Sequence, residues 1–171
     1  MFGSTPQPPQ IPPAKQPEQL APLPMPKEMT PPATANRMAI VLFSGTIDKL
    51  MSASIMATGA AAMGMDVEIF LTNWGVWAFR KDDYLTNTRV SADYADKRGV
   101  LLEQIAAKKV TSWMENLEGA KEIGSVRITA CSHSMTLFDL QLSDLEPIVD
   151  EVIGVAAFIE RARESAMTLY I

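Results

Sequence analysis

Length, composition and charge exclude several classes of protein. The chain of 171 residues has one cysteine and one histidine, so it can form no internal disulfide and cannot supply the ligands of a structural zinc site; we expect no metal and no cofactor. Its 15 basic and 20 acidic residues give a net charge of -5, which argues against nucleic acid as a partner. The longest uncharged stretch, residues 50–65, is too short and too polar for a membrane span. A free thiol, together with the lack of a basic region followed by an apolar run at the N-terminus, is typical of a cytoplasmic protein.

The first 36 residues differ in composition from the rest of the chain. Eleven of the twelve prolines lie between Pro6 and Pro32, and large apolar residues are few there. This composition predicts a disordered arm, residues 1–36, with polyproline character. A plain tether is the favoured role for it, and a ligand for a proline-reading partner is the alternative. Residues 37–171 are long enough to form one domain with a single core.

In this domain, apolar runs alternate with alanine-rich or amphipathic stretches. The first run, Met38–Phe43, is continuous and stops at Ser44-Gly45, which is typical of a strand buried on both faces. The helix after it is apolar almost all round, so we expect it to pack closely rather than face water. The expected elements are that helix, from a cap at Thr46 or Asp48 to about Met63 and closed by Gly64, then a strand at Val67–Leu71 and a turn at residues 72–75.

The middle of the chain interrupts the alternation. Residues 80–109 carry twelve charges in thirty residues, which predicts an irregular excursion with a helix at 100–108. The alternation then returns. The expected elements are an amphipathic helix at 110–122 with Val110, Trp113, Met114 and Leu117 on one face, a strand at 126–130, a helix at 132–140, a loop or short strand at 145–153, an amphipathic helix at 154–164 and a buried strand at 167–171.

The order of these elements predicts an α/β fold. Strands joined by helices of this length form right-handed parallel crossovers. We therefore expect an open, mainly parallel five-stranded sheet with helices on both faces. In such sheets the reactive groups collect at the carboxyl ends of the strands. Three segments qualify as candidate sites: residues 44–48, 72–75 and 130–135.

The third of these segments holds the only thiol and the only imidazole of the chain. A cysteine that ends a strand and opens a helix lies beside the unpaired amides at the positive end of the helix dipole, a setting that suits a nucleophilic sulfur. Cys131 is therefore predicted to be reactive and reachable from solvent. The alternative is a small buried hydrophobic residue, which is the usual state of a free cysteine.

Other residues of these segments each allow two interpretations. His133 is either part of the site wall or a bystander, because residues two apart on a helix point in different directions. Ser44 and Asp48 either hydrogen-bond a ligand or cap the first helix, with capping favoured for Asp48. Gly45 marks a tight turn or permits the close approach of a ligand. The two tryptophans after the second strand either wall a pocket or pack, with packing favoured.

Five segments in this order resemble the DsrE/DsrF-like sulfur-relay proteins. They are the first strand with its Ser-Gly turn, the alanine-rich helix ending at Gly64, Thr72-Asn73-Trp74-Gly75, Ala130-Cys131-Ser132-His133-Ser134-Met135, and the ending at residues 152–159 and 169–171. The resemblance covers about residues 37–171. It is greatest to the branch found beside small TusA-like sulfur carriers, rhodaneses and heterodisulfide-reductase-like sulfur-oxidation systems.

The resemblance implies a function. In that family the position of Cys131 carries sulfur as a persulfide, or as a thiosulfonate when thiosulfate is the cargo. It also implies a parallel sheet and a homo-oligomer, a trimer or a hexamer, with a TusA-like sulfur carrier as partner and a rhodanese or a heterodisulfide-reductase-like complex as further candidates. Around the cysteine, the candidate substrate-binding residues are Ser44, Gly45, Asn73, Trp74, Ser132, His133, Ser134 and Met135.

Departures from the family pattern affect the expected cargo. His133 stands where many members have methionine, and Asp139 lies near a usual glycine. With no second cysteine to resolve a loaded thiol, the cargo must leave through the thiol of a partner or stay in place. We therefore expect a cytoplasmic sulfur carrier or sulfurtransferase, and the rival is a non-catalytic scaffold subunit of a sulfur-transfer complex. A cysteine hydrolase is disfavoured, because it needs a base oriented by a third group.

Overall fold

Five strands form a single parallel sheet in the computed structural model, which describes residues 36–171. Their spatial order is β4-β3-β2-β1-β5. Their bounds are β1 Arg37–Leu42, β2 Asp66–Leu71, β3 Val126–Cys131, β4 Glu151–Ile153 and β5 Met167–Tyr170. The predicted α/β fold with a five-stranded parallel sheet is confirmed. The predicted arm lies outside the described residues, except for Asn36.

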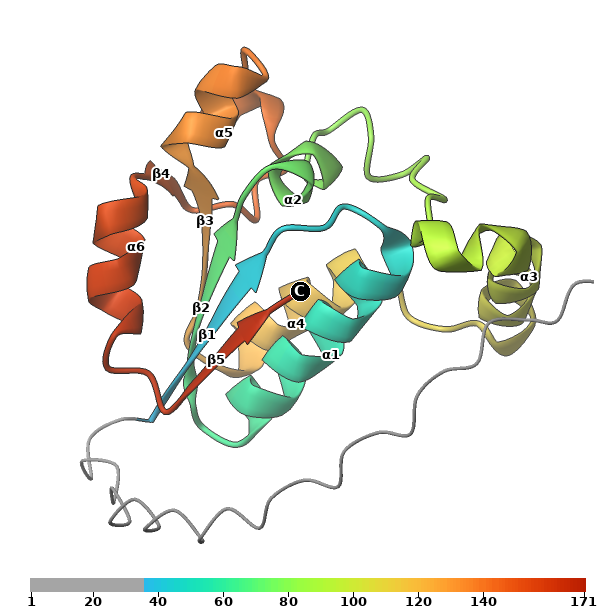
Figure 1. Cartoon of the computed structure of the whole chain (residues 1–171). Helices are drawn as coiled ribbons and strands as arrows, with labels where there is room; N and C mark the ends of the chain where they lie inside the picture. Colours follow the sequence, from blue (N-terminus) through green and yellow to red (C-terminus); the bar gives the residue numbers. More distant parts are fainter. Residues whose placement is uncertain (1–35) are drawn as a thin grey trace, which may run out of the picture. The chain divides into compact units, whose positions relative to one another are not determined.

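Helices cover both faces of the sheet, as predicted. They are α1 Ile47–Ala62, α2 Trp74–Ala78, α3 Arg98–Lys108, α4 Trp113–Ile123, α5 Ser132–Leu137 and α6 Val155–Ala162. Figure 1 shows α1 and α4 side by side on one face of the sheet and α6 on the other. The short helices α2 and α5 lie at the carboxyl ends of β2 and β3. The carboxyl edge of the sheet is thus built from loops and short helices.

The two faces of the sheet bury two separate clusters of side chains. Because successive side chains of a strand point to opposite faces, Ile40, Ile69 and Ile128 face α1 and α4, whereas Phe70 and Cys131 face α6. The cluster under α1 and α4 holds most of the buried apolar side chains. The buried members under α6 are Ala39, Phe70, Cys131, Ile153 and Phe158. Cys131 therefore belongs to the smaller cluster.

Helix α1 packs closely on one side only. Ala57 and Ala61 are buried, and Thr58 Oγ1 donates to the carbonyl oxygen of Asn116 in α4 (3.0 Å). Ile55, on another side of the helix, is 58% exposed. The side of α1 that carries Ile55 is apolar, but no described residue covers it. The prediction that this helix packs closely rather than facing water is therefore wrong for that side.

The helix predicted at 110–122 begins later than expected. Ser112 is the N-cap of α4: its Oγ accepts from the Glu115 amide (3.2 Å), and the Glu115 carboxylate accepts from the Ser112 amide (2.8 Å). This capping box satisfies two amides that would otherwise lack a partner. Val110 lies before the cap and is exposed, so it does not belong to the buried face of the helix.

The last strand and the helix after Cys131 also differ from expectation. β5 is an edge strand that pairs with β1, and its Met167 and Tyr170 are exposed rather than buried. The helix predicted to reach residue 140 ends at Leu137, close to Asp139, whose backbone is left-handed (φ 52°). The segment 145–153, expected to be a loop or a short strand, contains the short strand β4 at its end.

The charged excursion in the middle of the chain is attached to the domain at the start of α1. The amide and the hydroxyl of Ser91 donate to the carboxylate of Asp48, and the carbonyl oxygen of Arg89 accepts from the Ile47 amide (2.8 Å). Beyond this attachment, the 3₁₀ helix at Ala92–Lys97 and α3 contain no buried residue. The helix expected near the end of the excursion is confirmed as α3.

Candidate functional site

Cys131 is the last residue of β3 and the N-cap of α5. It pairs in register with Ile153 of β4. The backbone passes from strand to helix without a loop, so the amides of the first turn of α5 follow the cysteine immediately. Such amides have no carbonyl partner within their helix and can donate to an anionic group beside the N-cap. The predicted junction of strand and helix at this cysteine is confirmed.

The side chain of Cys131 is buried rather than open. The residue is only 6% exposed, and it packs in the cluster under α6 with Phe70, Ile153 and Phe158. The expectation that the thiol is reachable from solvent is therefore wrong for this arrangement of the chain. Strand periodicity tells which face a side chain meets, but not which later segment covers that face.

Helix α6 is held on the sheet by an aromatic pair and an ionic cluster. Phe158 is the only buried residue of α6 and stacks on Phe70 of β2, with ring centroids 4.5 Å apart and planes at 9°. At the end of the helix, Arg161 Nη1 donates to Glu151 Oε1 (2.9 Å) and to Glu68 Oε1 (3.3 Å). These contacts join α6 to β2 and β4.

Glu68 is the buried carboxylate of the ionic cluster, with a side chain that is 6% exposed. Burial raises the pKa of Glu68, although the hydrogen bond and the charge of Arg161 act to lower it. The hydrogen bond to Glu151 is the main cause that raises the pKa of Arg161, so its guanidinium stays a cation. The cluster lies at the amino end of the sheet on the face that also carries Cys131.

Two of the predicted substrate-binding residues, Asn73 and Ser134, form a hydrogen-bonded joint between α5 and the end of β2. The Oγ of Ser134 accepts from the amide of Asn73 (2.8 Å) and lies 3.3 Å from Thr72 Oγ1. Ser134 is buried, and Met135 is buried in the larger cluster. The joint fixes α5 to the end of β2. The hydroxyl of Ser134 therefore has partners within the protein.

Three other predicted residues, Ser44, Gly45 and Trp74, line a pocket of about 320 Å³ at the carboxyl end of β1. Trp77 and Arg89 also line it. Cys131 is not among the lining residues. The predicted site residues therefore fall into three groups: residues that line this pocket, residues that join α5 to β2, and Cys131 in the cluster under α6.

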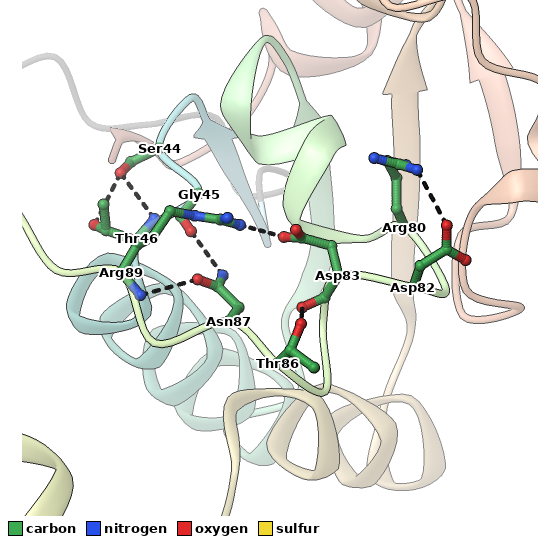
Figure 2. A network of polar contacts seen from close by, with 9 residues as sticks. All are labelled: Ser44, Gly45, Thr46, Arg80, Asp82, Asp83, Thr86, Asn87 and Arg89. Atoms are coloured by element: carbon green, nitrogen blue, oxygen red, sulfur yellow. Dashed lines mark hydrogen bonds and ion pairs between the residues drawn. The ribbon is translucent and has the colours of Figure 1, made fainter.

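Residues of the charged excursion contact the loop that lines this pocket, and Figure 2 shows their polar contacts. Asn87 Nδ2 donates to the carbonyl oxygen of Gly45 (2.8 Å), and the Arg89 amide donates to Asn87 Oδ1 (3.1 Å). The guanidinium of Arg89 forms an ion pair with Asp83. Asn87 and Arg89 are not predictable as site residues from the sequence, because their segment has neither a helical nor a strand period and its charges are typical of a solvated loop.

Asp48 has a different role from the one predicted. Thr46, not Asp48, is the N-cap of α1, and the carboxylate of Asp48 holds Ser91 of the excursion. Burial acts to raise the pKa of Asp48, but hydrogen bonds from Ser91 and Thr46 outweigh it and lower the pKa below its ordinary value. The carboxylate of Asp48 therefore links α1 to the charged excursion through its hydrogen bonds with Ser91.

Ser132 and His133, which follow the cysteine, are both exposed. Within residues 36–171, the His133 side chain makes no hydrogen bond to the protein. A place for His133 in the wall of the site stays a prediction. Their backbone amides belong to the first turn of α5, which begins beside the sulfur.

The fold and the site define a class of protein: a parallel α/β domain whose single cysteine ends the third strand and caps a short helix. Residues 34–170 match the model of the family described as the DsrE/DsrF/DrsH-like family. The chain belongs to this family, which confirms the resemblance found in the sequence.

Two curated relatives match the chain over most of their length. The uncharacterized protein YrkE of Bacillus subtilis (strain 168) is 34% identical over 156 residues, which cover 79% of this chain and 96% of YrkE. The sulfur carrier protein DsrE2 of Allochromatium vinosum is 27% identical over 156 residues, covering 79% of this chain and 98% of DsrE2.

Two solved structures are also similar. A protein of unknown function, MTH1491 from Methanobacterium thermoautotrophicum, has a TM-score of 0.49 and 17% identity, covering 78% of this chain and 97% of its own. The YchN protein from E. coli has a TM-score of 0.49 and 13% identity, covering 79% and 98%. Among the helices of residues 36–171, none has the length and apolarity needed to span a membrane.

Proposed function

We propose that this protein is a sulfur-relay protein that carries sulfane sulfur or thiosulfate on Cys131 and exchanges it with a partner carrier. The observation that carries the proposal is the placement of the cysteine at the end of β3 and the start of α5. A chain with one cysteine has one sulfur acceptor of this kind. A relative that is named a sulfur carrier protein supports the same role.

Loading with sulfane sulfur transfers one sulfur atom from a donor persulfide to the Cys131 thiolate. The Cys131 thiolate attacks the outer sulfur of a persulfide on the donor, a new S–S bond forms at Cys131, and the S–S bond of the donor breaks. The donor cysteine leaves as a thiolate, so no external oxidant or reductant is needed. In this proposal the amides of Ser132 and His133, which belong to the first turn of α5, donate to the terminal anionic sulfur.

Loading with thiosulfate follows the same logic from a different donor. The thiolate attacks an inner sulfur of tetrathionate, Cys131 gains a thiosulfate group through a new S–S bond, and thiosulfate leaves with the electron pair of the broken bond. Because the chain holds no second cysteine, unloading requires a thiol from another molecule. We propose a TusA-like sulfur carrier as that molecule, in the cytoplasm, with a rhodanese or a heterodisulfide-reductase-like complex as alternatives.

Intact-mass spectrometry tests this proposal directly. The full chain is incubated with polysulfide, tetrathionate, thiosulfate or a loaded TusA-like carrier, with Cys131→Ser as the matched control. We expect the wild type to gain the mass of one sulfur atom or of a thiosulfate group, and Cys131→Ser to gain neither. Addition of an unloaded carrier should then return the mass to its starting value.

The burial of Cys131 favours one rival, a scaffold subunit whose cysteine is silent. This rival predicts no cysteine-dependent mass gain from any of the donors, including the loaded carrier. That result would replace the relay function with the scaffold function.

A further inference from the structure

The thiol that the proposed function needs is buried in the cluster that also holds Phe158 of α6, a helix that begins beside it. Ile153 pairs with Cys131 in the sheet, and α6 starts two residues after Ile153. Gly154 forms the link, and a Cβ at this position would lie 4.0 Å from the Oγ of Ser132. No long loop separates the thiol from its cover, so a displacement of α6 at Gly154 acts directly on the surroundings of the sulfur.

The attachment of α6 to the sheet is limited to a few contacts. Phe158 is its only buried side chain, and Val155 and Ile159 are 57% and 58% exposed. Phe158, which stacks on Phe70, is therefore the main apolar anchor of the helix, with Ala162 packed against the same cluster. Elements with few buried apolar contacts open locally at a smaller cost in free energy than the whole domain.

The ionic cluster provides the second attachment. Arg161 is hydrogen-bonded to Glu68 and Glu151 by its guanidinium, and its carbonyl oxygen accepts from Arg37 Nη1 (3.0 Å). Because Glu68 is buried, removal of the guanidinium would leave a buried carboxylate without its cation. The cluster therefore holds the far end of α6 against the sheet.

We propose that α6 is a cover over the sulfur site, and that Phe158 and Arg161 control how often the Cys131 thiol becomes reachable. This inference rests on the proposed function, because controlled access matters only for a thiol that reacts. In the closed arrangement a sulfur on Cys131 is shielded from small thiols and oxidants in solution. In the open arrangement it meets the thiol of a partner.

Alkylation kinetics measure this access, because Cys131 is the only cysteine of the chain. Iodoacetamide forms an S–C bond with the thiolate and releases iodide, and intact-mass spectrometry follows the product. Phe158→Ala should raise the alkylation rate of the folded full chain by about tenfold or more. Arg161→Met should raise it several-fold, and Arg161→Lys should return it towards the wild-type rate. Ile159→Ala, on the exposed side of the same helix, should leave it unchanged.

A second control separates opening of α6 from unfolding of the domain. Leu117 of α4 is buried in the cluster on the other face of the sheet, so Leu117→Ala lowers global stability without touching α6. The free energy of unfolding of each variant is measured by denaturant titration. We expect Phe158→Ala to be alkylated much faster than Leu117→Ala at equal global stability. If the alkylation rates simply follow global stability, or if Phe158→Ala reacts no faster than Ile159→Ala, α6 does not control access and the inference is overturned.

The failure of this inference differs from the failure of the proposed function. If the wild type accepts sulfur on Cys131 but alkylation is unaffected by Phe158→Ala, the relay stands and the cover does not. If Phe158→Ala speeds alkylation while neither it nor the wild type takes sulfur from any donor, the cover stands and the relay does not.

Discussion

Two glycines determine how closely the loops at the carboxyl edge of the sheet pack. A Cβ on Gly45 would overlap the carbonyl oxygen of Trp74, and a Cβ on Gly75 would overlap that of Leu42. Both obstacles are backbone atoms, which cannot move aside as a flexible side chain can. Gly45 is therefore needed for the close approach of its loop to the backbone of Trp74, and the tight turn and the approach of a ligand both stay predictions.

We expect Gly45→Ala and Gly75→Ala each to lower the free energy of unfolding by about 2 kcal/mol or more, because each methyl group forces a shift of the backbone. Denaturant titration measures the loss. The matched control is Gly59→Ala in α1, where an added Cβ meets nothing within 4 Å and the gain in helix propensity is about 0.5–1 kcal/mol of stability. Stability equal to the wild type in both loop variants would contradict the close packing.

Asp48 gives a prediction with a defined pH dependence. Its pKa is lower in the folded chain than the ordinary value of 3.8, because hydrogen bonds from Ser91 and Thr46 outweigh the effect of burial. The folded state thus binds fewer protons than the unfolded state in this range. The contribution of Asp48 is fully present above pH 3.8 and is lost as the pH falls through the lowered pKa.

We expect Asp48→Asn to reduce the free energy of unfolding at pH 7 by about 1 kcal/mol, a figure kept small because the carboxylate is partly exposed. Thermal unfolding of wild type and variant as a function of pH measures the difference. The difference in stability between wild type and Asp48→Asn should shrink as the pH drops below the ordinary pKa of an aspartate. The control Asp93→Asn, at an exposed position of the same excursion, should show no such difference. A loss that is equally large in acid would mean that the effect is steric.

The start of α4 illustrates what a single element can reveal in the sequence. Residues 112–115 carry the pattern Ser-x-x-Glu, which marks the beginning of a helix, and the structure forms both hydrogen bonds of the capping box. The apolar period alone predicts a start at Val110, whereas the capping residue is Ser112. The capping residues therefore predict the start of α4 more accurately than the apolar period does.

The cap supports a prediction for α4 as a whole. Ser112→Ala removes the acceptor for the Glu115 amide, and we expect it to lower the free energy of unfolding by about 1 kcal/mol. Ser112→Thr, which retains a hydroxyl, should stay close to the wild type. Equilibrium denaturation of the three proteins gives the comparison, and equal stability of the alanine and threonine variants would count against the capping role.

Other elements depend on packing that no local pattern contains. β1, β2 and β3 were predicted from their apolar runs, because strands buried on both faces show themselves by composition. β5 has a similar composition but lies at the edge of the sheet, a position set by the order of the strands and not by its own residues. The cover of Cys131 depends in the same way on where α6 crosses the sheet. The sequence therefore predicts the position of the thiol at a strand end, but not its burial.

For the molecule as a whole, β5 is one of the two edge strands of the sheet, and we predict that a second copy pairs there. Within residues 36–171, β5 has one neighbour in the sheet, so its other edge carries unpaired backbone groups. Tyr170 is 70% exposed and stacks on Phe43, with ring centroids 6.0 Å apart, and Met167 is also exposed. An exposed edge strand with aromatic and apolar side chains is typical of an interface.

We expect the full chain to form an oligomer through this edge, and light scattering coupled to size-exclusion chromatography to give a mass that is a multiple of 18.7 kDa. The double variant Met167→Lys with Tyr170→Arg places charges on the edge and should lower the mass to that of a single chain, with unchanged circular dichroism. Val100→Lys on α3, which is also exposed but lies far from β5 in the chain, is the matched control and should keep the wild-type mass. A wild type that stays at 18.7 kDa at the highest concentration reached, or a double variant that still associates, would show that β5 is not the interface.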